Sequence, residues 1–155
     1  GTGRGRNRQA LEAMKRDISV LMASDQRYVS VLLTQIGHAP WPDRPASRSV
    51  TEHGKMVAQI QDEWLGELVE IIDSAGRLEK TTIIVTGDHS TPSVMKYHSW
   101  HPVPVMIYSK CCRPDNVKHF GERECITGGL GPRFPAEDLI PLALANAQRL
   151  EKFGA

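Results

Sequence analysis

The sequence lacks the features that would mark a membrane-spanning, secreted or nucleic-acid-binding protein. No run of residues approaches the roughly 18 consecutive apolar positions that a membrane span needs, and the formal net charge of +1 argues against a general nucleic-acid surface. Cysteine is scarce, because the chain holds only Cys111, Cys112 and Cys125. Three cysteines cannot all pair within one chain, and a bridge between the adjacent two would be strained. We therefore expect reduced thiols in a cytoplasmic protein.

Two common enzyme motifs are also missing. Asp88, His89 and Ser90 include the residue types of a hydrolase triad, but no G-x-S-x-G elbow is present and neighbours on a turn rarely face one another. The glycine-rich "GGLG" at 128–131 lacks the Lys-Ser/Thr pair of a P-loop and the G-x-G-x-x-G spacing. A flexible connection is the better interpretation of that stretch.

The length and composition suit one ordinary core. The chain has 155 residues, of which 40% are hydrophobic and 24% charged, so a single domain is expected. The first eight residues, "GTGRGRNR", hold three arginines, three glycines and almost nothing apolar. They are typical of a disordered basic end, which leaves 9–155 for the domain.

Three segments have apolar residues at helical spacing, namely 9–24, 50–74 and 136–152. The middle one is the most regular, with Ser49 or Thr51 as N-cap and Gly76 placed to end it. Three short apolar runs predict buried strands, at 28–33, 82–86 and 103–108, and three prolines make 39–49 a loop. Alternating strands and helices predict an α/β fold with a mostly parallel sheet and flanking helices.

Histidines cluster beside two of the predicted strands. Asp88 and His89 follow the strand at 82–86 directly, and His98 and His101 precede the one at 103–108. Three of the six histidines thus fall within thirteen residues. Ligands of open α/β sheets bind at the carboxyl ends of strands, and carboxylate and imidazole donors suit zinc or manganese. His38 also follows a predicted strand, which favours a metal site over an exposed surface turn, the competing interpretation.

Other polar residues fit a solvated surface better. His53 lies in the polar first turn of the long helix, and His119 lies in the charged run "NVKHFGERE". Lys96 and Arg133 are anion partners only if the fold brings them to the site.

Two segments resemble a known family. "VTGDHSTPSVMKYHSWHPVPVMIYS" and "ERECITGGLGPRFPAEDLIPLALANAQRLEKFGA" are similar to the C-terminal part of archaeal-type cofactor-independent phosphoglycerate mutases, in the alkaline phosphatase superfamily, over 82–155. "YVSVLLTQIGHAPWPD" and "IQDEWLGELVEIIDSAGRLEKTTIIVTGDH" are closer in character to sulfatases and to phosphoethanolamine- or lipoteichoic-type transferases. The two groups share metal-centred chemistry, so the difference affects the substrate more than the reaction type.

The resemblance implies a divalent metal site, with manganese or zinc, and an alkaline-phosphatase-like core. Asp88 and His89 are expected to bind one metal, His98 is expected to bind a second one, and His38 matches the histidine of the family's D-x-x-G-H element as a further ligand. Thr34 stands where the family's D-x-x-G-H element has its aspartate, so the second metal site lacks one of the ligands that the family has. Neighbours of the ligands, or contacts for an anion, are expected at His101, Lys96 and Ser90.

The resemblance also implies a reaction, metal-dependent phosphoryl transfer that interconverts monophosphoglycerates through a phosphoserine. Nothing before Arg27 matches the family's nucleophile-bearing unit. The nucleophile is therefore expected outside this chain, and 9–155 is expected to be a partial metal-binding domain, the C-terminal portion of a larger one. The expected partner is a small phosphorylated or sulfated substrate. The alternatives are a sulfatase-like or phosphoester hydrolase or transferase, and a catalytically inactive module.

Overall fold

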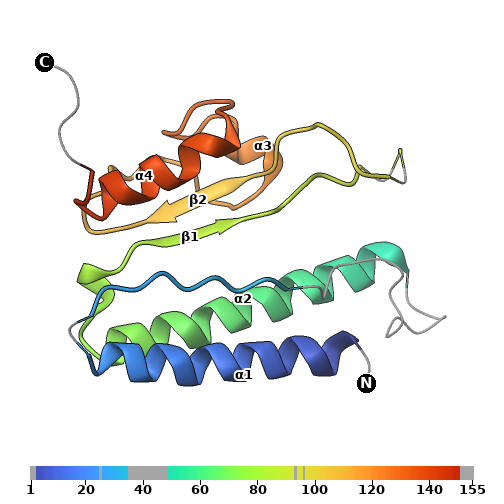
Figure 1. Cartoon of the computed structure of the whole chain (residues 1–155). Coiled ribbons are helices and arrows are strands. Elements are labelled where there is room, and N and C mark those ends of the chain that lie inside the picture. Colours follow the sequence, from blue (N-terminus) through green and yellow to red (C-terminus); the bar gives the residue numbers. More distant parts are fainter. Residues whose placement is uncertain (1–2, 25, 35–48, 93, 96, 151–155) are drawn as a thin grey trace, which may run out of the picture. The chain divides into compact units, whose positions relative to one another are not determined.

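A computed structural model describes residues 3–24, 26–34, 49–92, 94–95 and 97–150 (Figure 1). The chain divides into two compact units, Gly1–Leu78 and Glu79–Ala155. The first is built from helices and the second holds the strands. The prediction of one domain over 9–155 stays a prediction. None of the helices in the described ranges is long and apolar enough to cross a membrane.

The first unit is a pair of packed helices. Helix α1 spans Gly3–Met22 and α2 spans Val50–Ser74, and the two lie side by side in Figure 1. Their apolar stripes supply the buried hydrophobic side chains, Leu11, Ile18, Met22, Val57, Ile60, Trp64, Leu68 and Ile72. In α2 these positions recur every three or four residues, and in α1 they are seven and four residues apart, as one face of a helix requires. Both predicted helical segments are confirmed.

Helix α2 has the predicted bounds because both ends are closed by hydrogen bonds. Ser49 is the N-cap: its hydroxyl accepts the Glu52 backbone N–H at 3.2 Å, and the Glu52 carboxylate accepts the Ser49 backbone N–H at 3.0 Å. This reciprocal pair is a capping box. At the other end Gly76 has φ 64°, and the Arg77 N–H donates to the Ile72 carbonyl at 3.0 Å. Glycine adopts this left-handed conformation without strain.

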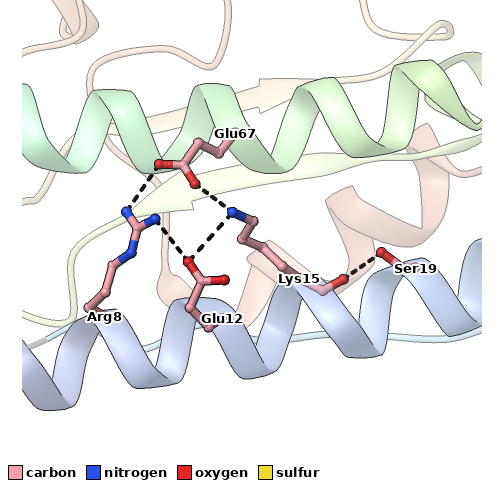
Figure 2. A network of polar contacts seen from close by, with 5 residues as sticks. All are labelled: Arg8, Glu12, Lys15, Ser19 and Glu67. Atoms are coloured by element: carbon pink, nitrogen blue, oxygen red, sulfur yellow. Dashed lines mark hydrogen bonds and ion pairs between the residues drawn. The ribbon is translucent and has the colours of Figure 1, made fainter.

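Helix α1 begins at Gly3, six residues before the predicted start at Gln9. Residues 3–8 of the segment expected to be disordered are thus part of the helix. Four charged side chains lie between α1 and α2 (Figure 2). Arg8 pairs with Glu12 at 2.9 Å and with Glu67 at 3.2 Å. The sequence pattern did not reveal this link between the helices, because Glu67 is far from Arg8 along the chain.

Lys15 completes this charged network. Its ammonium lies 2.7 Å from Glu67 and 3.5 Å from Glu12 (Figure 2). The hydrogen bond to Glu67 raises the pKa of Lys15, and the same bond lowers the pKa of Glu67. Both shifts favour the charged forms. The same residues Lys15 and Glu67 also line a shallow, open hollow with Glu70, Ile71 and Ser74.

Two sequence-based predictions in this unit were wrong. The segment 28–33, expected to be a buried strand, has no regular structure, and its Val29, Val31 and Leu33 are 90%, 76% and 75% exposed. Within the described residues it pairs with no strand, and these three side chains are left largely exposed. His53 was expected on the surface but is only 3% exposed. It lies one turn before Val57, on the buried face of α2.

The second unit contains a two-stranded sheet. Strand β1 spans Ile83–Thr86 and β2 spans Val105–Tyr108, with Ile83 opposite Tyr108 and Thr86 opposite Val105. Both predicted strands are confirmed. Their pairing is antiparallel, so the predicted mostly parallel sheet is not confirmed. A parallel pair needs a crossover, usually helical, whereas the described part of the connection 87–104 holds no helix.

Short helices follow β2. They are α3, Glu122–Cys125; η2, Ala136–Asp138; and α4, Leu139–Asn146; a further short turn, η1, Leu78–Lys80, precedes β1. The last helix is shorter than the predicted 136–152, because Gln148 has φ 54° and the Arg149 N–H turns back to the Leu144 carbonyl at 2.7 Å. Residues 151–152 lie outside the described part of the chain.

Candidate functional site

The site starts at the carboxyl end of β1. After Gly87, the Asp88 carboxylate accepts the His89 backbone N–H at 3.0 Å through one oxygen. Its other oxygen lies 3.5 Å from Nε2 of His89. The Asp88 side chain is 76% exposed and that of His89 34% exposed. A carboxylate and an imidazole thus lie together where an ion from solvent can reach them.

His98 joins this pair from the other side of the hairpin. The ring centroids of His89 and His98 are 3.7 Å apart, with the rings tilted by 47°. Backbone pairing explains their approach, since Ser90 and Ser99 form an antiparallel bridge and the Ser99 N–H donates to the Ser90 carbonyl at 3.0 Å. This bridge extends the β1–β2 pairing to the residues next to both histidines.

Thr91 connects the two imidazoles. Its hydroxyl oxygen lies 3.2 Å from Nδ1 of His89 and 3.3 Å from Nδ1 of His98. The spacing of residues in the sequence did not reveal Thr91. A hydroxyl two positions after His89, within the same turn, was the available clue, but Thr in a turn is common for purely local reasons.

His101 makes separate contacts. Its Nδ1 lies 2.7 Å from the Ser99 hydroxyl, and its ring stacks on Trp100 with centroids 4.5 Å apart and an interplanar angle of 13°. No contact of His101 with Asp88 is found among the described residues. Its expected role beside the ligands stays a prediction.

The remaining candidates are dispersed. Ser90 is buried at the β-bridge, with 7% exposure. Thr34 belongs to the first unit, where its hydroxyl accepts the Gln61 side-chain N–H at 3.1 Å. His38 and Lys96 lie outside the described residues. His119 and Arg133 are exposed, as expected.

The donor types suit a divalent metal, although the side chains that carry them are not gathered around one position. Asp88 offers carboxylate oxygen, and His89 and His98 offer imidazole nitrogen, which suits manganese or zinc. Across the described ranges, no group of three His, Cys, Asp or Glu side chains is already placed to hold one ion. A shared ion would require these exposed side chains to converge further. Their role as ligands stays a prediction.

Comparison with known proteins adds independent findings. A family model described as the metalloenzyme superfamily matches residues 37–142, which include Asp88, His89 and His98. A probable 2,3-bisphosphoglycerate-independent phosphoglycerate mutase of Thermosipho melanesiensis is 50% identical over 101 residues, 65% of this chain and 23% of the relative. A 2,3-bisphosphoglycerate-independent phosphoglycerate mutase of Thermococcus kodakarensis is 45% identical over 94 residues, 61% of this chain and 22% of the relative.

A solved structure is also similar. The PH0037 protein of Pyrococcus horikoshii matches with a TM-score of 0.60 and 38% sequence identity, over 67% of this chain and 30% of that one. The chain therefore spans between 22% and 30% of the length of these relatives.

Proposed function

The chain belongs to the metalloenzyme superfamily, and on this premise we propose that it supplies one side of a metal-dependent phosphoryl-transfer site. One observation carries the proposal. Asp88, His89 and His98 lie together at the end of β1, although the two histidines are nine positions apart along the chain. A carboxylate and two imidazoles gathered at a strand end form a donor set for a divalent cation.

The proposed reaction is the interconversion of monophosphoglycerates. Its support is that the similar proteins of Thermosipho melanesiensis and Thermococcus kodakarensis carry the name phosphoglycerate mutase. The proposed substrate is thus a small phosphorylated acid. When bound, manganese or zinc would offset negative charge on the phosphoryl group and lower the pKa of an attacking hydroxyl.

In this proposal, the residues of this chain bind and orient the divalent cation. Asp88 supplies a negative charge and two oxygens, and His89 and His98 supply neutral ring nitrogens. We propose that the attacking hydroxyl comes from polypeptide outside this chain, because nothing before Arg27 matches the family's nucleophile-bearing unit. The three cysteines are free thiols, which fits the reducing cytoplasm as the proposed location.

Metal binding tests the proposal directly. We expect the purified chain to bind Mn²⁺ or Zn²⁺ in a calorimetric titration, and Asp88→Asn and His98→Ala to bind at least about tenfold more weakly, because each loses a donor. His119→Ala is the matched control, since His119 is an exposed histidine that is not part of the cluster. Equal metal binding in all four proteins would refute the ligand assignment.

Substrate recognition is tested on the metal-loaded chain. If the site receives a phosphorylated acid, 3-phosphoglycerate should raise the affinity for Mn²⁺, because its phosphate adds oxygen donors and negative charge. Glycerate, which lacks the phosphate, should leave the affinity unchanged. Tighter Mn²⁺ binding with inorganic sulfate but none with 3-phosphoglycerate would instead favour a sulfate-ester enzyme.

A further inference from the structure

A single atom of Thr91, its hydroxyl oxygen, contacts two imidazoles. Its hydroxyl oxygen is within 3.2 Å of Nδ1 of His89 and 3.3 Å of Nδ1 of His98. A hydroxyl has one hydrogen to donate and two lone pairs that accept. If both contacts are hydrogen bonds, the hydroxyl can donate in at most one of them. At least one of the two histidines must therefore carry its proton on Nδ1.

The same contacts leave the other ring nitrogens available. With Nδ1 of each imidazole directed at Thr91, Nε2 is the nitrogen that remains for a further partner. For His89 that nitrogen already lies 3.5 Å from the Asp88 carboxylate. A neutral histidine that binds a cation through Nε2 holds its proton on Nδ1, where it needs an acceptor. The Thr91 oxygen can accept from both rings at once, through its two lone pairs.

The backbone around Thr91 is held on both sides. Ser90 accepts the Ser99 N–H at 3.0 Å in the β-bridge, and the Pro92 carbonyl accepts the Met95 N–H at 3.0 Å. Threonine is also β-branched, so its χ1 rotation is restricted. The hydroxyl oxygen is therefore placed by fixed backbone and a stiff side chain, while the imidazoles themselves are exposed.

We propose that Thr91 is a positioning residue, whose hydroxyl orients His89 and His98 so that each presents Nε2 to a divalent cation. This inference rests on the proposed metal site and adds to it a residue that donates no ligand atom. Hydrogen-bonding partners of ligand histidines commonly set both the tautomer and the ring orientation. Loss of the hydroxyl would leave the donors present but poorly aligned.

Imidazole tautomers in the metal-free protein provide the first test. Proton-detected nitrogen NMR should show an Nδ1-protonated ring at His89 or His98 in the wild type and in Thr91→Ser, which keeps the hydroxyl. Thr91→Val should convert it to the Nε2-protonated form. Thr127→Val is the matched control, because its hydroxyl donates to the Glu124 carbonyl at 2.9 Å. Unchanged tautomers in Thr91→Val would overturn the inference.

Titration with Zn²⁺ provides the second test. Thr91→Val should bind Zn²⁺ about 10- to 100-fold more weakly than the wild type, with Thr91→Ser close to the wild type and Thr127→Val unchanged. Equal affinity of Thr91→Val and the wild type would overturn the positioning role. If the wild type bound no Zn²⁺, the proposed metal site would fail, and the inference built on it would fall even with the expected tautomers.

Discussion

Asp115 organises the glycine-rich turn at 128–131. One carboxylate oxygen accepts the Gly129 N–H at 2.6 Å and the other accepts the Val117 N–H at 2.9 Å. The bond from Gly129 and then that from Val117 lower the pKa of Asp115, because both stabilise the charged form. A Cβ at Gly128 would lie 2.9 Å from this carboxylate, so a larger residue there would displace the Asp115 side chain. The stretch expected to be a flexible connection is therefore held by hydrogen bonds.

The contact of Asp115 with this turn should depend on pH. A lowered folded-state pKa means that the contribution is complete above the ordinary aspartate pKa of about 3.9 and is lost as pH falls through the lower folded value. The Gly129 amide should thus exchange with solvent faster, relative to free peptide, below about pH 4. Asp115→Asn should show faster exchange at neutral pH, because its NH₂ group cannot accept a hydrogen bond.

Hydrogen exchange followed by NMR checks this expectation. Asp138→Asn is the matched control, because Asp138 makes no side-chain capping bond. Equal protection of Gly129 in the wild type and in Asp115→Asn would show that the carboxylate does not hold the turn.

At the scale of elements, α2 is the element whose bounds follow most directly from local sequence signals. Its apolar stripe, its N-cap and its terminating glycine agree on the same bounds, Val50–Ser74. Such agreement between local signals is what lets a segment be predicted without its surroundings. Helix α1 also followed from its stripe, but its extension to Gly3 did not, because contacts with Glu67 of α2 involve Arg8 in that extension.

Removing the N-cap of α2 should destabilise the chain. Ser49→Ala deletes the oxygen that accepts the Glu52 N–H, and such changes typically cost about 1 kcal/mol. Urea unfolding followed by helical circular dichroism measures the loss as a lower midpoint with an unchanged slope. Ser74→Ala, an exposed serine at the other end of α2, is the control and should leave the midpoint within experimental error. Identical midpoints for both variants would contradict the capping role.

At the scale of the whole molecule, the two units differ in burial. All the buried hydrophobic side chains of the described chain come from α1 and α2, and none comes from the unit that begins at Glu79. A two-stranded sheet has little capacity to bury apolar side chains by itself. The segment Tyr28–Thr34 likewise leaves apolar side chains uncovered. Its seven residues contain no charge, proline or glycine, and three of its apolar side chains are largely exposed.

This segment is expected to promote self-association. Uncharged, apolar, extended chain without a pairing strand is prone to pair with another copy. Val31→Lys should therefore reduce the concentration-dependent increase in light scattering, because a charge opposes such pairing. Val94→Lys is the control, since Val94 is 92% exposed but lies in a turn. The same reduction in both variants would attribute the effect to net charge alone.

The candidate site was predictable in part. Sequence spacing placed Asp88 and His89 after a strand and His98 before the next one, and the structure has these three side chains as neighbours. Thr91 could not be found in this way, since its importance depends on two imidazoles meeting at one oxygen. His101 follows His98 by only three positions, yet its contacts are with Ser99 and Trp100.

The sequence by itself determined the helices, the two strands and the donor types beside them, because periodicity, caps and residue chemistry are local properties. Only the tertiary structure decided that β1 and β2 run antiparallel, that His53 is buried, that 28–33 forms no strand, and that Thr91 contacts two imidazoles. Each of these depends on which distant segment supplies a hydrogen-bonding or packing partner, and such pairings are not encoded in the spacing of neighbouring residues.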